Sequence, residues 1–110
     1  MEMETAVRYD SPIVCVVAMD RAWSMIRWQQ VLGYGKNRAH ACDLELRAYE
    51  KVVEALGGYG ERVTEPDAIR PALERAFASG RPACLNVVTQ SVVSPETNWP
   101  WRIPERYKER

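Results

Sequence analysis

Seven consecutive apolar residues, from Ile13 to Met19, form an unbroken run that is rich in β-branched side chains and ends at Asp20. This pattern predicts a strand that is buried on both faces, as in a parallel sheet covered by helices. In such sheets, ligands bind at the carboxyl ends of the strands. Asp20 therefore lies where a functional site is expected.

The remaining elements follow from hydrophobic spacing and from glycine and proline positions. Thr64 and Asp67 resemble an N-cap pair for one helix, in which Ile69, Leu73, Ala76 and Phe77 should be buried. The predicted helices end near Tyr9 and span residues 22–32, 46–56 and 64–79, and the predicted strands span 13–19, 61–63 and 83–89. Alternating elements of this kind predict an α/β fold, a partial three-layer parallel sheet with flanking helices.

Composition narrows the functional class. The 110 residues are enough for one domain, and a hydrophobic content of 46% indicates a folded chain. The net charge is zero without long charge runs, so neither a nucleic acid nor a membrane partner is expected. Cys15 and Cys84 fall in predicted buried strands, Cys42 in a loop, and no spacing suggests zinc. With no apparent signal peptide, we expect a cytoplasmic protein.

Several blocks carry a family resemblance. They are the segment from Met3 to Trp28 with its Asp-x-x-Trp-x-Met motif, the segment from Tyr49 to Gly60, the segment from Ile69 to Leu73, and Asn86-Val87. Together they resemble the thiamine-diphosphate-binding domain of acetolactate synthase-like enzymes. This group includes benzaldehyde lyase-type enzymes, oxalyl-CoA decarboxylases and 2-hydroxyacyl-CoA lyases. The resemblance covers residues 1–90 and implies the C-terminal part of that domain, an incomplete thiamine-diphosphate-binding fold. Residues 91–110 are expected to form an extended tail.

The resemblance implies a cofactor site just after the first strand. Asp20 matches a side-chain ligand of the Mg²⁺ that holds the diphosphate, and the backbone carbonyl of Ala22 matches the next ligand. Trp23, Ser24 and Met25 match the segment that lies along the cofactor, where a helix N-terminus favours phosphate. The alternative for Asp20 is a loop residue that caps the following helix. For Trp23 and Met25 the alternative is core packing.

The family's remaining machinery is not found in these residues. Relatives carry a Gly-Asp-Gly loop with a second Mg²⁺ ligand and an activating Glu in a separate domain, and this sequence has no Gly-Asp-Gly. No catalytic residue is therefore assigned here. The resemblance implies a lyase, decarboxylase or carboligase acting on an α-keto acid or 2-hydroxyacyl substrate, with or without CoA. Either a larger subunit supplies the missing parts, as in a hetero-oligomer with this chain as small subunit, or the chain is a fragment of such an enzyme. In both cases the chain alone should be inactive.

Two substitutions relative to the family's pattern support a different function. Met19 cannot make the polar contact of the Asn that relatives often carry, and Ser24 adds a side chain where they have Gly. A non-catalytic interaction or regulatory subunit that keeps the fold is therefore the alternative. A flavodoxin-like binding domain ranks third, because no Gly-rich phosphate loop follows a first strand.

Overall fold

The computed structural model describes residues 2–93. The chain divides into two compact units, which are described separately. The α/β body comprises residues 2–19 and 47–89, and the α2 unit comprises residues 20–46 together with 90–93. Within the described residues, no helix is both long enough and apolar enough to cross a membrane.

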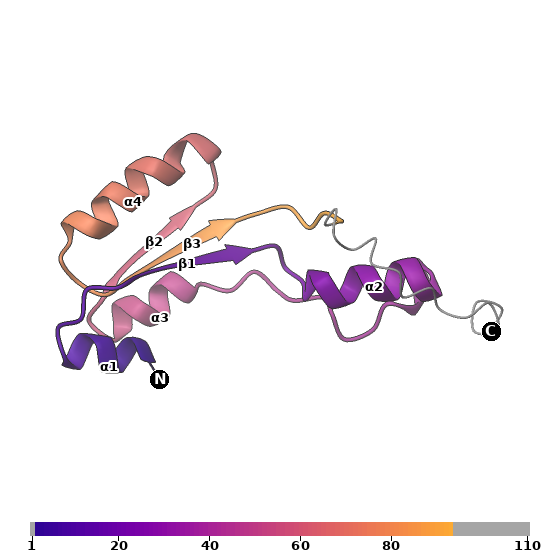
Figure 1. The fold of residues 1–110 in the computed structure, drawn as a ribbon, viewed down its shortest axis with the longest axis horizontal. Helices are drawn as coiled ribbons and strands as arrows, with labels where there is room; N and C mark the ends of the chain where they lie inside the picture. Colours follow the sequence, from indigo (N-terminus) through magenta and orange to yellow (C-terminus); the bar gives the residue numbers. More distant parts are fainter. Residues whose placement is uncertain (1, 94–110) are drawn as a thin grey trace. The chain divides into compact units, whose positions relative to one another are not determined.

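The α/β body has three layers (Figure 1). Helix α4 covers one face of a three-stranded sheet, and α1 and α3 lie on the other face. The elements of the body are α1 (Glu2–Arg8), β1 (Val14–Met19), α3 (Tyr49–Ala55), β2 (Tyr59–Val63), α4 (Ile69–Ala78) and β3 (Ala83–Val88). The predicted α/β class is confirmed.

The sheet is entirely parallel, with β3 between the other two strands in the order β1-β3-β2. Ala83 in β3 pairs in register with Val14 on one side and with Tyr59 on the other. Beyond the strand end, the Thr89 N–H donates to the Met19 carbonyl at 2.9 Å. Because β3 has a neighbour on each side, it is the most buried strand.

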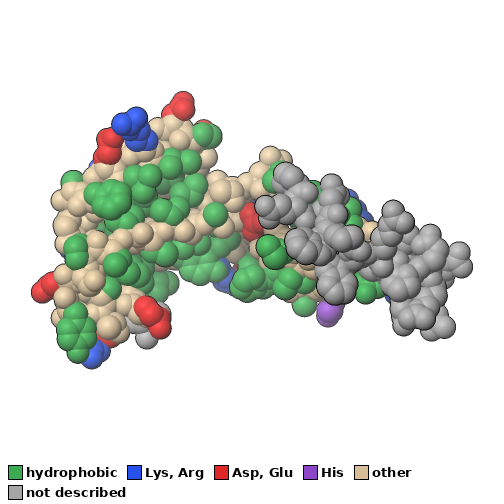
Figure 2. Space-filling view, viewed as in Figure 1, with side chains coloured by type: hydrophobic (Ala, Val, Ile, Leu, Met, Phe, Trp, Pro, Cys, Tyr) green, Lys and Arg blue, Asp and Glu red, His purple; other side chains and the backbone are tan. Residues whose placement is uncertain are grey.

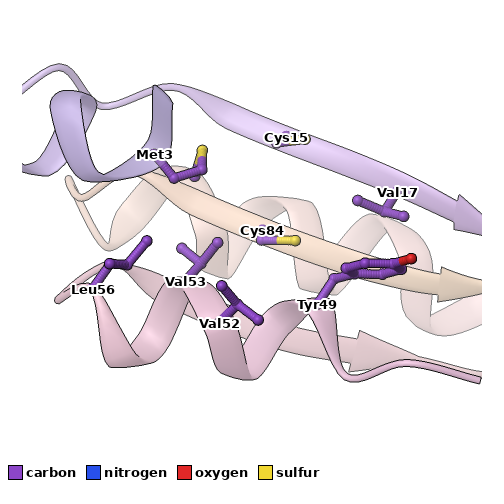
Figure 3. Close-up of a pocket in the computed structure, with 8 residues that line it drawn as sticks. All are labelled: Met3, Cys15, Val17, Tyr49, Val52, Val53, Leu56 and Cys84. Atoms are coloured by element: carbon purple, nitrogen blue, oxygen red, sulfur yellow. The ribbon is translucent and has the colours of Figure 1, made fainter. Parts of the chain in front are cut away.

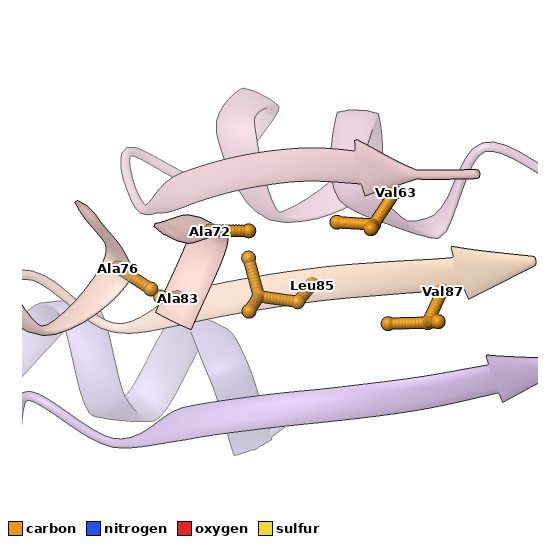
Figure 4. Packing of buried hydrophobic residues seen from close by; sticks show 6 residues of the cluster. All are labelled: Val63, Ala72, Ala76, Ala83, Leu85 and Val87. Atoms are coloured by element: carbon orange, nitrogen blue, oxygen red, sulfur yellow. The ribbon is translucent and has the colours of Figure 1, made fainter. Parts of the chain in front are cut away.

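The apolar core lies between the sheet and α4 (Figure 4). Small residues of α4 let the helix approach β3 closely, and Leu85 fills the space beneath it with 0% exposure. The core residues are Val63, Ala72, Ala76, Ala83, Leu85 and Val87.

On the other face, two glycines bring α3 and β2 together. A Cβ at Gly60 would lie 2.2 Å from the Glu50 carbonyl oxygen, and one at Gly58 would lie 2.5 Å from the Pro82 carbonyl oxygen. Such separations are far below contact distance, so only glycine permits this packing. The Gly57-to-Gly60 segment thus sets the distance between helix and strand.

A buried carboxylate also links α3 to the sheet. Glu50 is 4% exposed, accepts a hydrogen bond from Asn86 Nδ2 at 2.7 Å, and pairs with Arg62 at 2.9 Å. Burial raises the pKa of Glu50, but the hydrogen bonds and the Arg62 charge outweigh it and hold the pKa below its ordinary value. The same Asn86 amide donates to the Arg47 carbonyl at 2.8 Å.

The prediction that the first strand is buried on both faces is wrong for this structure. Val16 is 51% exposed and Cys15 is also exposed, because β1 is an edge strand and α4 packs mainly on β2 and β3. Hydrophobic side chains accordingly gather on the visible surface of the body near β1 and α4 (Figure 2). A strand with an entirely apolar sequence is expected to be covered by helices on both faces. Part of that cover is not found among the described residues.

Two details of the α4 prediction are also wrong. Phe77 is 67% exposed, because the buried face of α4 is formed by Ala72 and Ala76. Thr64 does not cap the helix. Instead, a short 3₁₀ turn at Pro66–Ala68 precedes α4, and its N-cap residue Glu65 makes no side-chain cap among the described residues.

The α2 unit contains α2 (Ser24–Tyr34) and a 3₁₀ turn, η1 (Lys36–Arg38). Helix α2 was expected to stop at Gly33, but it continues to Tyr34, and Gly35 ends it with a φ of +93°. In the body, α3 is shorter than predicted and β2 starts two residues earlier. The expected tail lies largely outside the described residues, so the boundary at residue 90 stays a prediction.

Candidate functional site

Asp20 directly follows β1 and begins a tight turn. Its Oδ1 accepts a hydrogen bond from the Ala22 N–H at 3.0 Å, and the intervening Arg21 has a φ of +62°. A non-glycine residue in the left-handed region costs about 1–2 kcal/mol, so the surrounding structure must hold this turn in place. A carboxylate has room for further partners, and the Ala22 bond occupies only one of its oxygens.

An antiparallel bridge between Ala22 and Asp43 holds the other side of the turn. The Trp23 N–H donates to the Cys42 carbonyl at 2.8 Å, and the Leu44 N–H donates to the Arg21 carbonyl at 2.7 Å. These two bonds engage backbone groups of the residues on either side of Ala22, the Arg21 carbonyl and the Trp23 N–H. The Ala22 carbonyl itself accepts no backbone hydrogen bond from the described residues.

Helix α2 begins immediately after this turn. Trp23 is its N-cap residue and makes no side-chain cap among the described residues, and the first turn holds no acidic residue. Unpaired N–H groups at such a helix start favour an anion. Asp20 does not cap α2, because its hydrogen bond goes to Ala22 outside the helix. The structure therefore does not show Asp20 capping α2.

The side chains around this helix start are open to solvent. Trp23 is 60% exposed and Met25 is 75% exposed, so neither packs into a core within the described residues. The Ser24 hydroxyl instead turns to Ser91, with 2.7 Å between the two Oγ atoms. Exposed apolar side chains beside free backbone N–H groups are suited to contact with a bound organic phosphate.

The five residues expected at the site, Asp20, Ala22, Trp23, Ser24 and Met25, lie together in one turn and the helix start that follows. The donors in this turn are oxygen atoms, which suit Mg²⁺, but two oxygens are fewer than the six of octahedral coordination. No group of three or more His, Cys, Asp or Glu side chains in the described part of the chain is placed to hold a metal ion. The site assignment itself stays a prediction.

Two features of the turn have no signal in the sequence. Nothing in the residue type indicates that Arg21 takes a left-handed conformation, because this region is usually occupied by glycine or asparagine. The pairing of Ser24 with Ser91 joins residues far apart in the chain, so no local pattern could predict it.

Comparison with known proteins identifies the family. The sequence profile of the thiamine pyrophosphate enzyme, C-terminal TPP binding domain, matches residues 1–87. The chain belongs to this family. The resemblance inferred from the sequence is thereby confirmed.

Several proteins are similar to this chain over most of its length. A probable acetolactate synthase from Mycobacterium bovis is 42% identical over 97 residues, which are 86% of this chain and 17% of the relative. A 2-hydroxyacyl-CoA lyase from Oryza sativa subsp. japonica is 31% identical, over 88% of this chain and 18% of the relative. A sulfoacetaldehyde acetyltransferase from Alcaligenes xylosoxydans xylosoxydans is 35% identical, over 70% of this chain and 13% of the relative.

The 110 residues thus span less than a fifth of the length of these relatives. Family membership implies thiamine diphosphate as the cofactor of the domain to which they belong.

Proposed function

We propose that this chain is part of a thiamine-diphosphate- and Mg²⁺-dependent enzyme that makes or breaks a carbon–carbon bond next to a carbonyl. The single observation that carries the proposal is the turn after β1. It leaves one carboxylate oxygen of Asp20 and the Ala22 carbonyl without backbone partners among the described residues, beside the uncapped start of α2. The names of the relatives support the reaction class.

Each residue of the turn has a definite part in this proposal. Asp20 and the Ala22 carbonyl would donate two oxygens to Mg²⁺, an ion that prefers oxygen ligands. The first N–H groups of α2, around Ser24, would bind the diphosphate, and Trp23 and Met25 would shield the site from water. When bound, thiamine diphosphate supplies the carbanion chemistry, so this chain's residues bind and orient.

The proposal assigns the rest of the site to further polypeptide, in the same chain or in a larger subunit. The 110 residues contain no Gly-Asp-Gly, and we assign no activating Glu among them. The exposed Val16, and an edge of β1 that pairs with no described strand, support an additional strand and covering helix at that side of the sheet. We therefore expect the 110 residues to be inactive by themselves.

The substrate in this proposal is an α-keto acid or a 2-hydroxyacyl compound, with or without CoA. Relatives named as a synthase, a lyase and an acetyltransferase share the same domain. Lyase and carboligase activities are opposite directions of one bond-forming step, so the same cofactor site suits both. The exposed side chains of α2 would lie beside the substrate entrance in this arrangement.

A non-catalytic interaction or regulatory subunit is the second candidate. Ser24 favours it, because its hydroxyl is bonded to Ser91 and its side chain occupies the helix start that a diphosphate would approach. Met19 also favours it, since a side chain that is 4% exposed offers no polar contact to a cofactor. This candidate keeps the fold and predicts no cofactor binding.

Native mass spectrometry of the protein, purified gently with Mg²⁺ and with any associated polypeptide, tests the proposal. We expect one thiamine diphosphate per site, lost in Asp20→Ala. Asp43→Ala is the matched control, because Asp43 is an exposed carboxylate in the same unit that pairs with Arg27. A complex without cofactor mass, or cofactor retained equally in Asp20→Ala, would favour the regulatory candidate.

A further inference from the structure

A hollow of about 190 Å³ opens in the α/β body beside β1 and β3, and its walls include residues of α1 and α3 (Figure 3). Three of its eight lining residues carry sulfur: Met3 from α1, Cys15 from β1 and Cys84 from β3. The other five are aliphatic or aromatic. Sulfur atoms are therefore the main candidate metal donors that face this space.

The two thiols are held together by the sheet. Cys15 and Cys84 are register partners on neighbouring parallel strands, and both side chains border the same hollow. Neighbouring strands lie about 4.8 Å apart, which places the two cysteines within reach of a single ion. Both are free thiols.

The two thiols differ in access to solvent. Cys15 is exposed, so an incoming ion can reach it, whereas Cys84 is 3% exposed. Burial, with a smaller effect of Cys15, raises the pKa of the Cys84 thiol to about 11, so it stays protonated at neutral pH. A metal that takes Cys84 as a ligand must displace its proton.

Met3 supplies a third soft donor. A thioether is a poor ligand for hard cations and for Zn²⁺, but together with thiolates it selects Cu(I). Zn²⁺ would require four N, S or O ligands, and no group of three or more His, Cys, Asp or Glu side chains within residues 2–93 could begin such a set. The ligand set is sulfur-only and low in number, which suits a monovalent soft ion.

We propose that Met3, Cys15 and Cys84 form a binding site for Cu(I) in this hollow. No redox change is involved: the ion forms bonds to the sulfur atoms, and each cysteine that becomes a thiolate passes its proton to solvent. The single positive charge of bound Cu(I) offsets one thiolate charge, so the ion with two thiolates has a net charge of −1. All of the lining residues belong to the body, and none of them lies in the turn after β1.

Anaerobic titration of the full chain with Cu(I), against a chromophoric Cu(I) chelator such as bicinchoninate, tests this site. We expect one Cu(I) per chain, and no displacement by an equal concentration of Zn²⁺. Cys15→Ser and Cys84→Ala should abolish binding. Met3→Leu should weaken it at least roughly tenfold, since even losing a group outside the ligand set costs that much.

Cys42→Ser is the matched control, because Cys42 is a buried free thiol outside the body. It should bind Cu(I) as the wild type does. Met3→Leu conserves volume at a partly exposed helix position, so it reports on ligation even if Cys84→Ala fails to fold. Unchanged affinity in Cys15→Ser or Met3→Leu, or a loss in Cys42→Ser, would overturn the proposal. None of these outcomes depends on thiamine diphosphate.

Discussion

The α/β body and the α2 unit are stabilised in different ways. Every residue of the apolar core belongs to the body, whereas α2, which is described over its whole length, has no buried residue. In the α2 unit, a few backbone bonds around the Ala22–Asp43 bridge hold the turn at Asp20. The described residues of the body therefore share a buried apolar core, whereas α2 contributes no buried side chain to its unit.

Leucine truncation should give the largest contrast between the two regions. Leu85→Ala should lower the free energy of unfolding by about 3 kcal/mol, because a fully buried leucine leaves a cavity. Leu32→Ala in α2 should change it by less than about 0.5 kcal/mol, since Leu32 is 57% exposed. Urea unfolding followed by circular dichroism measures both. Equal losses of unfolding free energy in the two variants would show that the two regions do not differ in this way.

Adding a methyl group to a glycine separates close packing from backbone conformation. Gly60→Ala should cost about 2 kcal/mol, because the new Cβ would lie 2.2 Å from the Glu50 carbonyl oxygen and force α3 away from β2. Gly35→Ala meets no described atom within 4 Å, but its φ of +93° should cost about 1 kcal/mol. Thermal unfolding of both variants gives the comparison. A smaller loss of stability in Gly60→Ala would mean that α3 can move away from β2 at little cost in free energy.

The pH dependence of stability should depend on the buried carboxylate of the body. Since the folded pKa of Glu50 is lowered, its contribution is present above pH 4.5 and is lost as the pH falls through the folded pKa. Glu50→Gln should therefore flatten the decline in the unfolding midpoint between about pH 7 and about pH 3. Glu61, whose pKa Arg75 also lowers, accounts for part of the slope that remains. An unchanged slope would show that Glu50 does not control it.

The smallest effect is expected at the ion pair of the α2 unit. Arg27 Nε lies 2.7 Å from Asp43 Oδ1, but the Asp43 side chain is 79% exposed. Arg27→Ala should cost about 0.5 kcal/mol or less, because water and salt screen exposed pairs. The free energies of unfolding of the wild type and of Arg27→Ala, measured at low and at high salt, would reveal the contribution of this ion pair. A loss that salt does not reduce would indicate packing of Arg27 on Trp28, whose ring centroid is 5.3 Å away.

The sequence predicts where the elements of the body lie, because apolar residues form an unbroken run in β1 and recur at helical spacing in α3 and α4. The run ending at Met19 identifies β1, and the position of Asp20 follows directly from it. The exposure of Val16 and Phe77 was not predictable, because a sequence pattern shows which residues are apolar but not whether a neighbour covers them. The location of the site at Asp20 stays a prediction. The Asp20–Ala22 hydrogen bond and the left-handed Arg21 could not be predicted, because they arise from backbone geometry.

The position of β3 between β1 and β2 also shapes how the chain acquires its structure. Val14 and Ala83 are partners in the sheet, yet roughly 70 residues separate them in the sequence. During synthesis, β1 and β2 emerge first and have no strand between them to pair with until β3 leaves the ribosome. Long-range parallel pairing of this kind forms slowly and leaves apolar strands open to aggregation in the meantime. Rapid dilution from denaturant should therefore give lower refolding yields at higher protein concentration.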